Sequence, residues 1–210
     1  MAMPATGAPH RRWTEEEFYS ARDAATAGER WELVDGEVLV TPSPHWIHQR
    51  VIARLFVRIE AYVRQHALGE AFPSPVDVKL EPGLVLQPDL LVVPAGELRR
   101  RSDVVRRLLL AVEILSPTSA RHDRVTKRPR YQRNRVPEYW IVDDTSQTVE
   151  RWTPDDNRAR AARGAAPLAS GGGSGSVRTR PRPFLRGRST GRRSGGIGTT
   201  AALDSVRDEA

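Results

Sequence analysis

Leu-Val-Leu-Gln-Pro-Asp-Leu-Leu-Val-Val (residues 84–93) and Leu-Leu-Leu-Ala-Val-Glu-Ile-Leu-Ser-Pro (residues 108–117) are the two apolar runs that decide the fold of this chain. Short, near-continuous apolar runs of this kind are typical of strands that are buried on both faces of a sheet. Each run contains one carboxylate, Asp89 in the first and Glu113 in the second. A buried carboxylate is strongly destabilising unless it is paired or binds a metal ion. Two such carboxylates on neighbouring strands predict a divalent-cation site.

Composition narrows the class of protein. The 210 residues include no cysteine, which excludes disulfides and thiolate metal sites. No apolar run approaches the ~18 residues of a transmembrane helix, and the N-terminus lacks the apolar core of a signal peptide. We therefore expect a cytoplasmic protein without a membrane partner.

The net charge of +7 is carried by the end of the chain. Residues 158–210 contain 11 Arg and 3 acidic residues, whereas residues 1–157 contain 22 basic and 23 acidic residues. The total charge thus says little about the partner of residues 13–157, which we predict to be the folded domain. Residues 1–12 are small, polar and Pro-containing, and they predict a disordered lead.

Residues 158–210 form an Arg- and Gly-rich segment with a single aromatic residue, Phe184. Such a segment cannot bury a core, so it predicts disorder. Two interpretations of it are open. A basic tail binds nucleic acid without sequence preference. Alternatively, the segment is a frameshifted reading of a GC-rich gene, which we favour because Arg, Ala, Gly, Pro and Ser dominate it.

Turn and periodicity signals give the order of elements. Thr14 and Glu17 form a capping box, and Asp35-Gly36 suits a two-residue hairpin turn. The expected elements are a helix over residues 14–25, a hairpin over 31–40 and a helix over 45–66. Strands follow over 76–80, 84–93 and 108–115, then a helix over 120–134 and a strand over 139–142. An edge strand is expected over 148–152. From residue 45 onward this order is αβββαβ. Pro129 is expected to kink the last helix or to confine its regular part to one side.

The two carboxylates suit Mg²⁺, which prefers oxygen ligands and takes one or two carboxylates from a protein. A bound cation of this kind activates water and stabilises charge on phosphorus, and a nearby lysine shares that charge. The chain has two lysines. Lys127 follows Glu113 on the next helix and is expected to reach back to it, whereas Lys79 is expected to face solvent.

Each of these residues also has a purely structural interpretation. Asp89 is suited to capping a turn. Glu113 is suited to a buried salt bridge with Arg121 or Arg124. Lys127 is suited to the solvated face of a basic helix.

Taken together, the motifs resemble the Uma2 family of restriction endonucleases, within the PD-(D/E)XK nuclease superfamily. The resemblance spans residues 13–152. It is carried by Glu-Leu-Val-Asp-Gly-Glu (32–37), His-Gln (48–49), Pro-Asp (88–89), Val-Glu-Ile-Leu-Ser-Pro (112–117), Asp123, Lys127, Tyr131 and Val-Pro-Glu-Tyr-Trp-Ile-Val-Asp (136–143). It implies an α/β fold with the αβββαβ core and mixed central sheet of restriction endonucleases, preceded by a helix and a β-hairpin.

The resemblance also implies a function, a metal-dependent DNA endonuclease that uses Mg²⁺ or Mn²⁺ and no organic cofactor. Asp89 and Glu113 would be the metal ligands, with the Ile114 carbonyl as a third. Lys127 would take the role of the superfamily lysine, because Leu115 stands at the position where Glu-x-Lys would put it. A homodimer suits the cutting of two strands.

Glu32 and His48 are accessory candidates for the same site, each with a structural alternative: an exposed hairpin residue and a structural histidine. The sequence departs from the family pattern at Pro129, two residues beyond Lys127, and at Asn134-Arg135, where a small residue and Gly are usual. Two other functions therefore stay open: a catalytically inactive nucleic-acid-binding protein of the same fold, and a frame-damaged relic.

Overall fold

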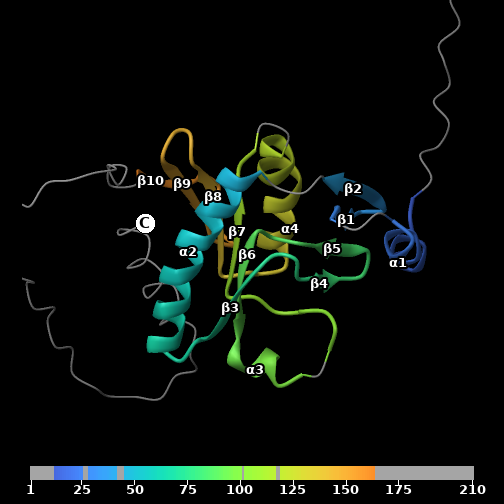
Figure 1. Cartoon of the computed structure of the whole chain (residues 1–210), viewed down its shortest axis with the longest axis horizontal. Helices are drawn as coiled ribbons and strands as arrows, with labels where there is room; N and C mark the ends of the chain where they lie inside the picture. The colour runs from blue at the N-terminus through green and yellow to red at the C-terminus, as the bar shows by residue number, and fades with distance from the viewer. Residues whose placement is uncertain (1–11, 26–27, 42–44, 101, 117–118, 164–210) are drawn as a thin grey trace, which may run out of the picture.

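In a computed structural model of the chain, the apolar run at residues 84–93 is divided between two sheets (Figure 1). β5 (Leu84–Leu86) belongs to a four-stranded sheet, and β6 (Leu90–Pro94) belongs to a six-stranded sheet. Pro88 lies between them and has no N–H group to donate to a ladder, so the first strand ends before it. The prediction of one continuous strand was wrong. Asp89 lies where the chain crosses from one sheet to the other.

The structure describes residues 12–25, 28–41, 45–100, 102–116 and 119–163. Residues 1–11 of the predicted lead and residues 164–210 of the predicted tail lie outside this part of the chain. Residues 158–163 belong to the described part, and β10 (Arg160–Arg163) pairs there with β9 (Thr148–Trp152). The six-stranded sheet therefore continues past the boundary predicted at residue 157.

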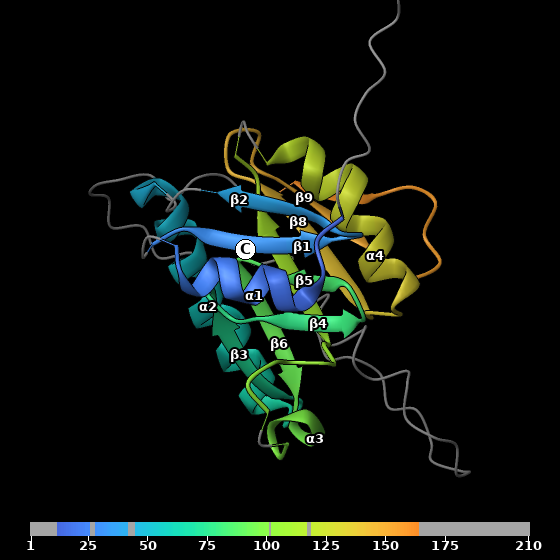
Figure 2. The same ribbon diagram turned by 90° about the vertical axis from the view of Figure 1, so that its right-hand side faces the viewer.

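The four-stranded sheet carries the predicted hairpin (Figure 2). In spatial order its strands are β2 (Glu37–Thr41), β1 (Arg30–Val34), β5 and β4 (Val78–Glu81). Asp35 and Gly36 have positive φ angles of 52° and 82°, as the two-residue turn requires. α1 (Glu15–Asp23) begins at the predicted capping box and packs Phe18 against Leu33 and Val85 of this sheet.

The six-stranded sheet has the order β10-β9-β8-β7-β6-β3. Its remaining strands are β8 (Glu138–Asp143), β7 (Leu110–Ile114) and β3 (Gly69–Pro73). β7 and β8 are parallel and the other neighbours are antiparallel, so the sheet is mixed, as predicted. β3 was not predicted because Gly-Glu-Ala-Phe-Pro has weak strand preference; its pairing with β6 makes it a strand.

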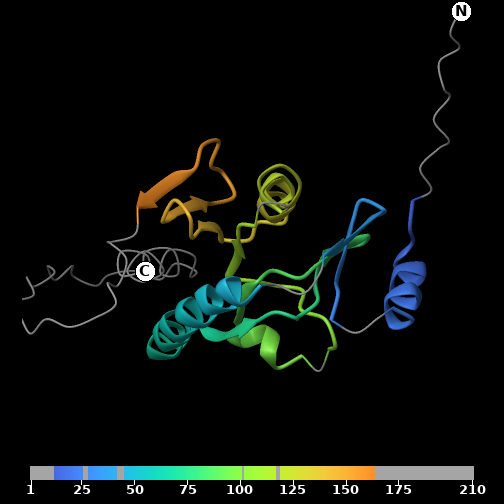
Figure 3. The same ribbon diagram turned by 45° about the horizontal axis from the view of Figure 1, so that its top comes forward.

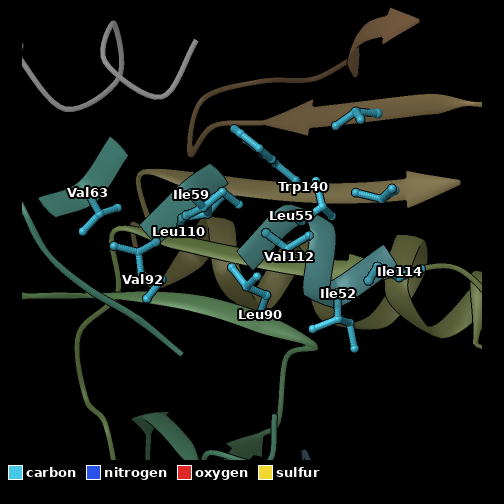
Figure 4. Packing of buried hydrophobic residues seen from close by; sticks show 13 residues of the cluster. Ile52, Leu55, Ile59, Val63, Leu90, Val92, Leu110, Val112, Ile114 and Trp140 are labelled. Carbon is cyan, nitrogen blue, oxygen red and sulfur yellow. The ribbon is translucent and has the colours of Figure 1, made fainter. Parts of the chain in front are cut away.

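α2 (Trp46–Gln65) covers one face of this sheet, and the predicted helix over residues 45–66 is confirmed. Its apolar residues recur at helical spacing and meet alternate residues of the strands (Figure 4). The buried members of this cluster include Ile52, Leu55, Ile59, Val63, Leu90, Val92, Leu110, Val112, Ile114 and Trp140. Ile114 and Val112 thus face α2, which directs Glu113 to the opposite face.

A π-helix, η1 (His122–Lys127), and α4 (Arg128–Arg133) cover that opposite face (Figure 3). Tyr131 of α4 stacks on Tyr139 of β8, with ring centroids 4.6 Å apart. Pro129 lies in the first turn of α4, directly after the π-helix, so the irregularity expected in this helix falls at the junction of the two segments. A short helix, α3 (Ala95–Leu98), follows β6.

The predicted α/β fold, with a mixed central sheet preceded by a helix and a hairpin, is confirmed. Among the helices of the described residues, none combines the length and the apolar character needed to cross a membrane.

Candidate active site

Asp89 is held at the crossing between the sheets by hydrogen bonds from three segments of the chain. Its Oδ1 accepts from Arg30 Nη1 at 2.5 Å, and its Oδ2 accepts from Ile114 N at 2.7 Å. The side chain is 2% exposed. Asp89 therefore ties β1 and β7 together, which is a different role from the turn cap considered as its structural alternative.

His48 lies on the first turns of α2 and completes the surroundings of Asp89. Its Nε2 lies 3.1 Å from Asp89 Oδ2 and 3.2 Å from Ile114 O. These two oxygens are the ones assigned to a metal ion from the family resemblance, and both converge on the same imidazole nitrogen. Burial raises the pKa of Asp89, but the hydrogen bond from His48 and the charge of Arg30 outweigh it, so the pKa is lowered and the group is ionised at neutral pH.

Glu113 is buried on the opposite face of β7, where it meets Lys127. Lys127 Nζ lies 2.9 Å from Glu113 Oε1, 2.8 Å from Glu32 Oε2 and 3.4 Å from Asp123 Oδ1. All four side chains are 1% exposed. The solvated-face alternative for Lys127 is therefore wrong. The structural alternative for Glu113 was a buried salt bridge with Arg121 or Arg124. Glu113 does form a buried salt bridge, but with Lys127, and Arg124 pairs with Glu150 at 2.6 Å.

The π-helix explains how Lys127 and Asp123 reach the same point. A π-turn contains more residues than an α-turn, so side chains four apart lie close to one line along the helix, and such turns are frequent at functional sites. Glu32 approaches from β1, where its Oε1 accepts a hydrogen bond from Gln87 N at 2.8 Å. The hairpin sheet and the π-helix thus close on Glu113 from two sides.

Burial and mutual repulsion shift the protonation of this group. Burial raises the pKa of Glu113 well above its usual range, and the neighbouring carboxylates add to this effect against the charge of Lys127. Burial raises the pKa of Asp123 for the same reason. Burial lowers the pKa of Lys127, but the charges of Glu113, Glu32 and Asp123 outweigh it, so the pKa is raised and the side chain stays an ammonium ion.

We call the assembly the acid cluster. It consists of four carboxylates and two cations: Glu32, Asp89, Glu113, Asp123, Arg30 and Lys127. With all six groups ionised its formal charge is −2. A divalent cation would balance that charge, and the donor atoms are the oxygens that Mg²⁺ prefers. The residues present therefore fit such an ion.

The described residues contain no preformed metal site, since no three Asp, Glu or His side chains among them form a group that could hold a metal ion. Lys127 Nζ contacts three of the carboxylates, and Arg30 contacts the fourth. Mg²⁺ does not need such a preformed site, because it usually keeps several waters and takes one or two carboxylates.

The structure gathers the five predicted site residues into two contacting groups, Asp89 with His48 and Glu113 with Lys127 and Glu32. Sequence reasoning missed Arg30 and gave no role to Asp123. Arg30 lies two residues before Glu32 on β1, so strand alternation puts the two on one face. Asp123 lies four residues before Lys127. Lys79 was expected to face solvent, but it is partly buried and pairs with Glu15, whose pKa this contact lowers.

A cavity of about 360 Å³ separates the hairpin from the η1–α4 segment beside the acid cluster. Its lining includes His122, Thr126 and Arg130 on one side and Asp35 and Glu37 on the other. His122 adjoins Asp123 in the chain, so the cavity borders the segment that carries two members of the buried group.

The arginines of this helical segment are mostly engaged within the chain. Arg130 pairs with Asp35, and Arg128 lies over the ring of Trp152 at 4.3 Å. Together with the Arg124 ion pair, these contacts leave Arg121, just before η1, as an exposed arginine without a described ion pair.

Comparisons with known proteins agree with this fold. The model of the family described as "Uma2: Putative restriction endonuclease" matches residues 15–169. Five solved chains match. One of them, "a putative nuclease belonging to DUF820" from Anabaena variabilis, is 17% identical with a TM-score of 0.63, and the match covers 75% of this chain and 89% of that chain. At this identity the likeness shows the fold alone. No curated protein matches the chain.

Proposed function

The chain belongs to the Uma2 family, and from this we propose that it is a cytoplasmic, metal-dependent DNA endonuclease that hydrolyses phosphodiester bonds. Family and fold support a nuclease of the restriction-endonuclease type. The finer parts of the proposal are the metal ion, DNA as the substrate, the residue roles and a homodimer in which each copy would cut one strand.

One observation carries the proposal. Asp89 directly precedes β6, and Glu113 lies on the neighbouring strand β7. Arg30 contacts Asp89, and the charges of Glu113 and Asp89 raise the pKa of Arg30 against its burial, so the two carboxylates lie in the same charged group. Lys127 lies against Glu113 in the same buried group. Two carboxylates that can hold a divalent cation and a lysine that can share the charge of the phosphate suit phosphodiester hydrolysis.

Asp89 and Glu113 would hold the Mg²⁺ or Mn²⁺ ion, with the Ile114 carbonyl as a further oxygen ligand. When bound, the ion would lower the pKa of a water molecule and offset negative charge on the phosphate. It would also replace the −2 formal charge of the acid cluster by neutrality, which favours ionised Glu113.

Lys127 would orient the attacking water and share the charge of the phosphate as a cation. It is unsuited to act as a base, because its raised pKa keeps it protonated at neutral pH. Glu32 would hold Lys127 in place through its contact with Nζ. His48 would hold Asp89 and the Ile114 carbonyl in position, since its Nε2 contacts both.

The test is a cleavage assay of the full chain with linear duplex, supercoiled and single-stranded DNA in Mg²⁺, Mn²⁺ or EDTA. We expect cleavage that requires the metal ion and is lost in Asp89→Ala. Asp144→Ala, a partly exposed carboxylate in the turn after β8, serves as the matched control and should cleave like the wild type. An Asp89→Ala protein that cleaves as well as Asp144→Ala would refute the assignment. Sedimentation of the same samples tests the homodimer.

A second candidate function is supported by the Arg30 contact. A guanidinium 2.5 Å from Asp89 Oδ1 already satisfies a carboxylate oxygen that a metal ion would need. An inactive nucleic-acid-binding protein of the same fold would have this property. Titration calorimetry with Mn²⁺ separates the two functions: binding that is lost in both Asp89→Ala and Glu113→Ala supports the nuclease, and no binding supports the second function.

A further inference from the structure

A second cavity, of about 490 Å³, lies at the opposite end of β7 from the acid cluster. Its lining includes Leu108 and Leu109, which precede β7, whereas Glu113 and Ile114 stand at the end of that strand. Five residues of strand place the two sites on the order of 17 Å apart. The second cavity is therefore separate from the proposed cleavage site.

Four arginines border this cavity. They are Arg100, Arg106, Arg107 and Arg135, and we call them with their cavity the arginine pocket. Glu97 is the one acidic side chain of the lining, so the formal charge of the lining is +3. Like charges around one cavity repel one another, and a bound anion would remove that repulsion.

Glu97 is committed to holding the wall of the pocket. It is 6% exposed; its Oε1 accepts from Arg106 N at 2.9 Å, and its Oε2 lies 3.7 Å from Arg100 Nε. No carboxylate of the described residues forms an ion pair with the side chain of Arg106 or Arg107. These two guanidinium groups are thus available to an external anion.

Arg135 is held at the pocket by an uncommon backbone conformation. Arg135 N donates to Gln132 O and Val136 N donates to Tyr131 O, both at 3.0 Å, so Arg135 occupies the left-handed position after α4 with φ of 54°. Glycine is preferred there because a side chain is strained. Its ion pair with Asp155 joins two exposed side chains, so that contact is weak and easily exchanged.

The walls beneath the arginines are apolar. They include Leu80, Leu108, Val136 and Pro137. A cavity of this volume, with apolar walls and a few convergent polar groups, is typical of small-ligand sites. Arginine forks match phosphate oxygens in charge and geometry. The ligand that fits both parts has a phosphate joined to a ring of low polarity.

We propose that the arginine pocket binds a nucleotide, with its phosphate on the arginines and its sugar and base against the apolar walls. A free mononucleotide and the 5′-phosphorylated end of a nucleic-acid strand share this chemistry. The pocket does not depend on cleavage, so it stands or falls independently of the proposed nuclease function.

The test is titration calorimetry of the full chain in EDTA with thymidine 5′-monophosphate, thymidine and inorganic phosphate. We expect the nucleotide to bind at least tenfold more tightly than phosphate and thymidine not to bind, because neither half of the ligand fills the pocket. The double variant Arg106→Ala, Arg107→Ala should weaken nucleotide binding by tenfold or more, since charge-assisted bonds are lost. Arg54→Ala, on the exposed face of α2, is the matched control and should bind like the wild type.

Arg135→Gly gives a sharper result, because its two effects have opposite signs. Removing the strained side chain should raise the unfolding temperature by about 2–4 °C, while nucleotide binding weakens about tenfold. A variant that only fails to fold would lower both quantities. Unchanged binding in Arg135→Gly, or equal losses in Arg54→Ala and the double variant, would overturn the proposal.

A second arm identifies the source of the nucleotide. A 5′-phosphorylated oligonucleotide of about ten nucleotides is compared with its unphosphorylated form. Binding of the mononucleotide supports a free ligand, and binding of the phosphorylated strand alone supports a strand end. If neither binds in a way that depends on Arg106 and Arg107, the proposal is wrong, whatever the cleavage assay gives.

Discussion

Charged side chains of opposite sign gather at the two ends of β7. At one end they pair with each other inside the chain, and at the other end they line a cavity. At the end of the strand, the acid cluster buries four carboxylates, and each contacts a buried or half-buried cation. At the start, the arginine pocket presents four cations to a cavity, and Glu97 engages one of their guanidinium groups. Charges satisfied inside the chain hold the fold together and position chemistry, whereas charges left at a cavity are suited to recognising something outside it.

The largest expected effect comes from removing the cation at the centre of the acid cluster. Lys127→Met should lower the free energy of unfolding by about 3–5 kcal/mol, because three buried carboxylates lose their partner. Urea unfolding in EDTA measures it. Added Mg²⁺ should restore part of the loss if the cluster binds the ion. Lys79→Met, which breaks the partly exposed pair with Glu15, should cost less than about 1 kcal/mol. Equal costs at the two lysines would remove the distinction between the regions.

Arg30→Met tests whether a cation inside the acid cluster competes with a metal ion. It changes the formal charge of the cluster from −2 to −3 and frees Asp89 Oδ1. We expect Mn²⁺ to bind about tenfold more tightly, or about 1.4 kcal/mol, as calorimetry would measure. The matched change Arg107→Met, at the other end of β7, should leave Mn²⁺ affinity unchanged. Weaker Mn²⁺ binding in Arg30→Met would mean that the guanidinium positions Asp89 for the ion.

Glu113→Gln examines the cost of burying charge in the acid cluster. The folded-state pKa of Glu113 is raised above its ordinary value of 4.5, so the folded state favours the protonated form. That contribution is present below the unfolded pKa and is lost as the pH rises through the folded pKa. The variant lacks this dependence and keeps Glu32 and Asp123 around Lys127. In EDTA at pH 8 it should therefore be more stable than the wild type by on the order of 1 kcal/mol. Thermal unfolding from pH 4 to pH 8 measures this, and a less stable variant at pH 8 would contradict it.

The smallest effect is expected in the arginine pocket. Arg107→Ala removes an exposed charge without an internal ion pair among the described residues, so its free energy of unfolding should stay within about 0.5 kcal/mol of the wild type. Urea unfolding measures it beside Lys127→Met. A loss approaching that of Lys127→Met would show that the pocket is structural.

Much of the acid cluster could be predicted from the sequence, because Asp89 and Glu113 interrupt apolar runs where a charge needs a reason. The position of Lys127 on the helix after Glu113 already linked the two, and the structure places Glu32 beside Lys127 and His48 beside Asp89. Arg30 escaped notice because it pairs with a residue 59 positions away, and no local pattern marks such a contact. The catalytic and metal-binding roles of these predicted site residues stay predictions.

Other parts of the fold were beyond local reasoning. The interruption of the strand within residues 84–93 follows from Pro88. The placement of the two halves in different sheets depends on their neighbours, which are β1 and β4 for β5, and β7 and β3 for β6. β3 exists because β6 offers it an edge. The arginine pocket joins residues near 100 with residues near 135, and in a chain with 31 arginines their grouping carries no signal in the sequence. The departure at Arg135 was visible as a missing glycine, while its location at a cavity was not.

The crossing at Gln87-Pro88-Asp89 has a consequence for the growing chain on the ribosome. Asp89 obtains its partners from residues 30 and 114, and Glu113 obtains its lysine from residue 127. A nascent chain that ends before residue 127 therefore has buried carboxylates without their cationic partner, and its acid cluster is incomplete. A nuclease assembled in this order would stay inactive during its own synthesis and become competent only when both sheets have docked.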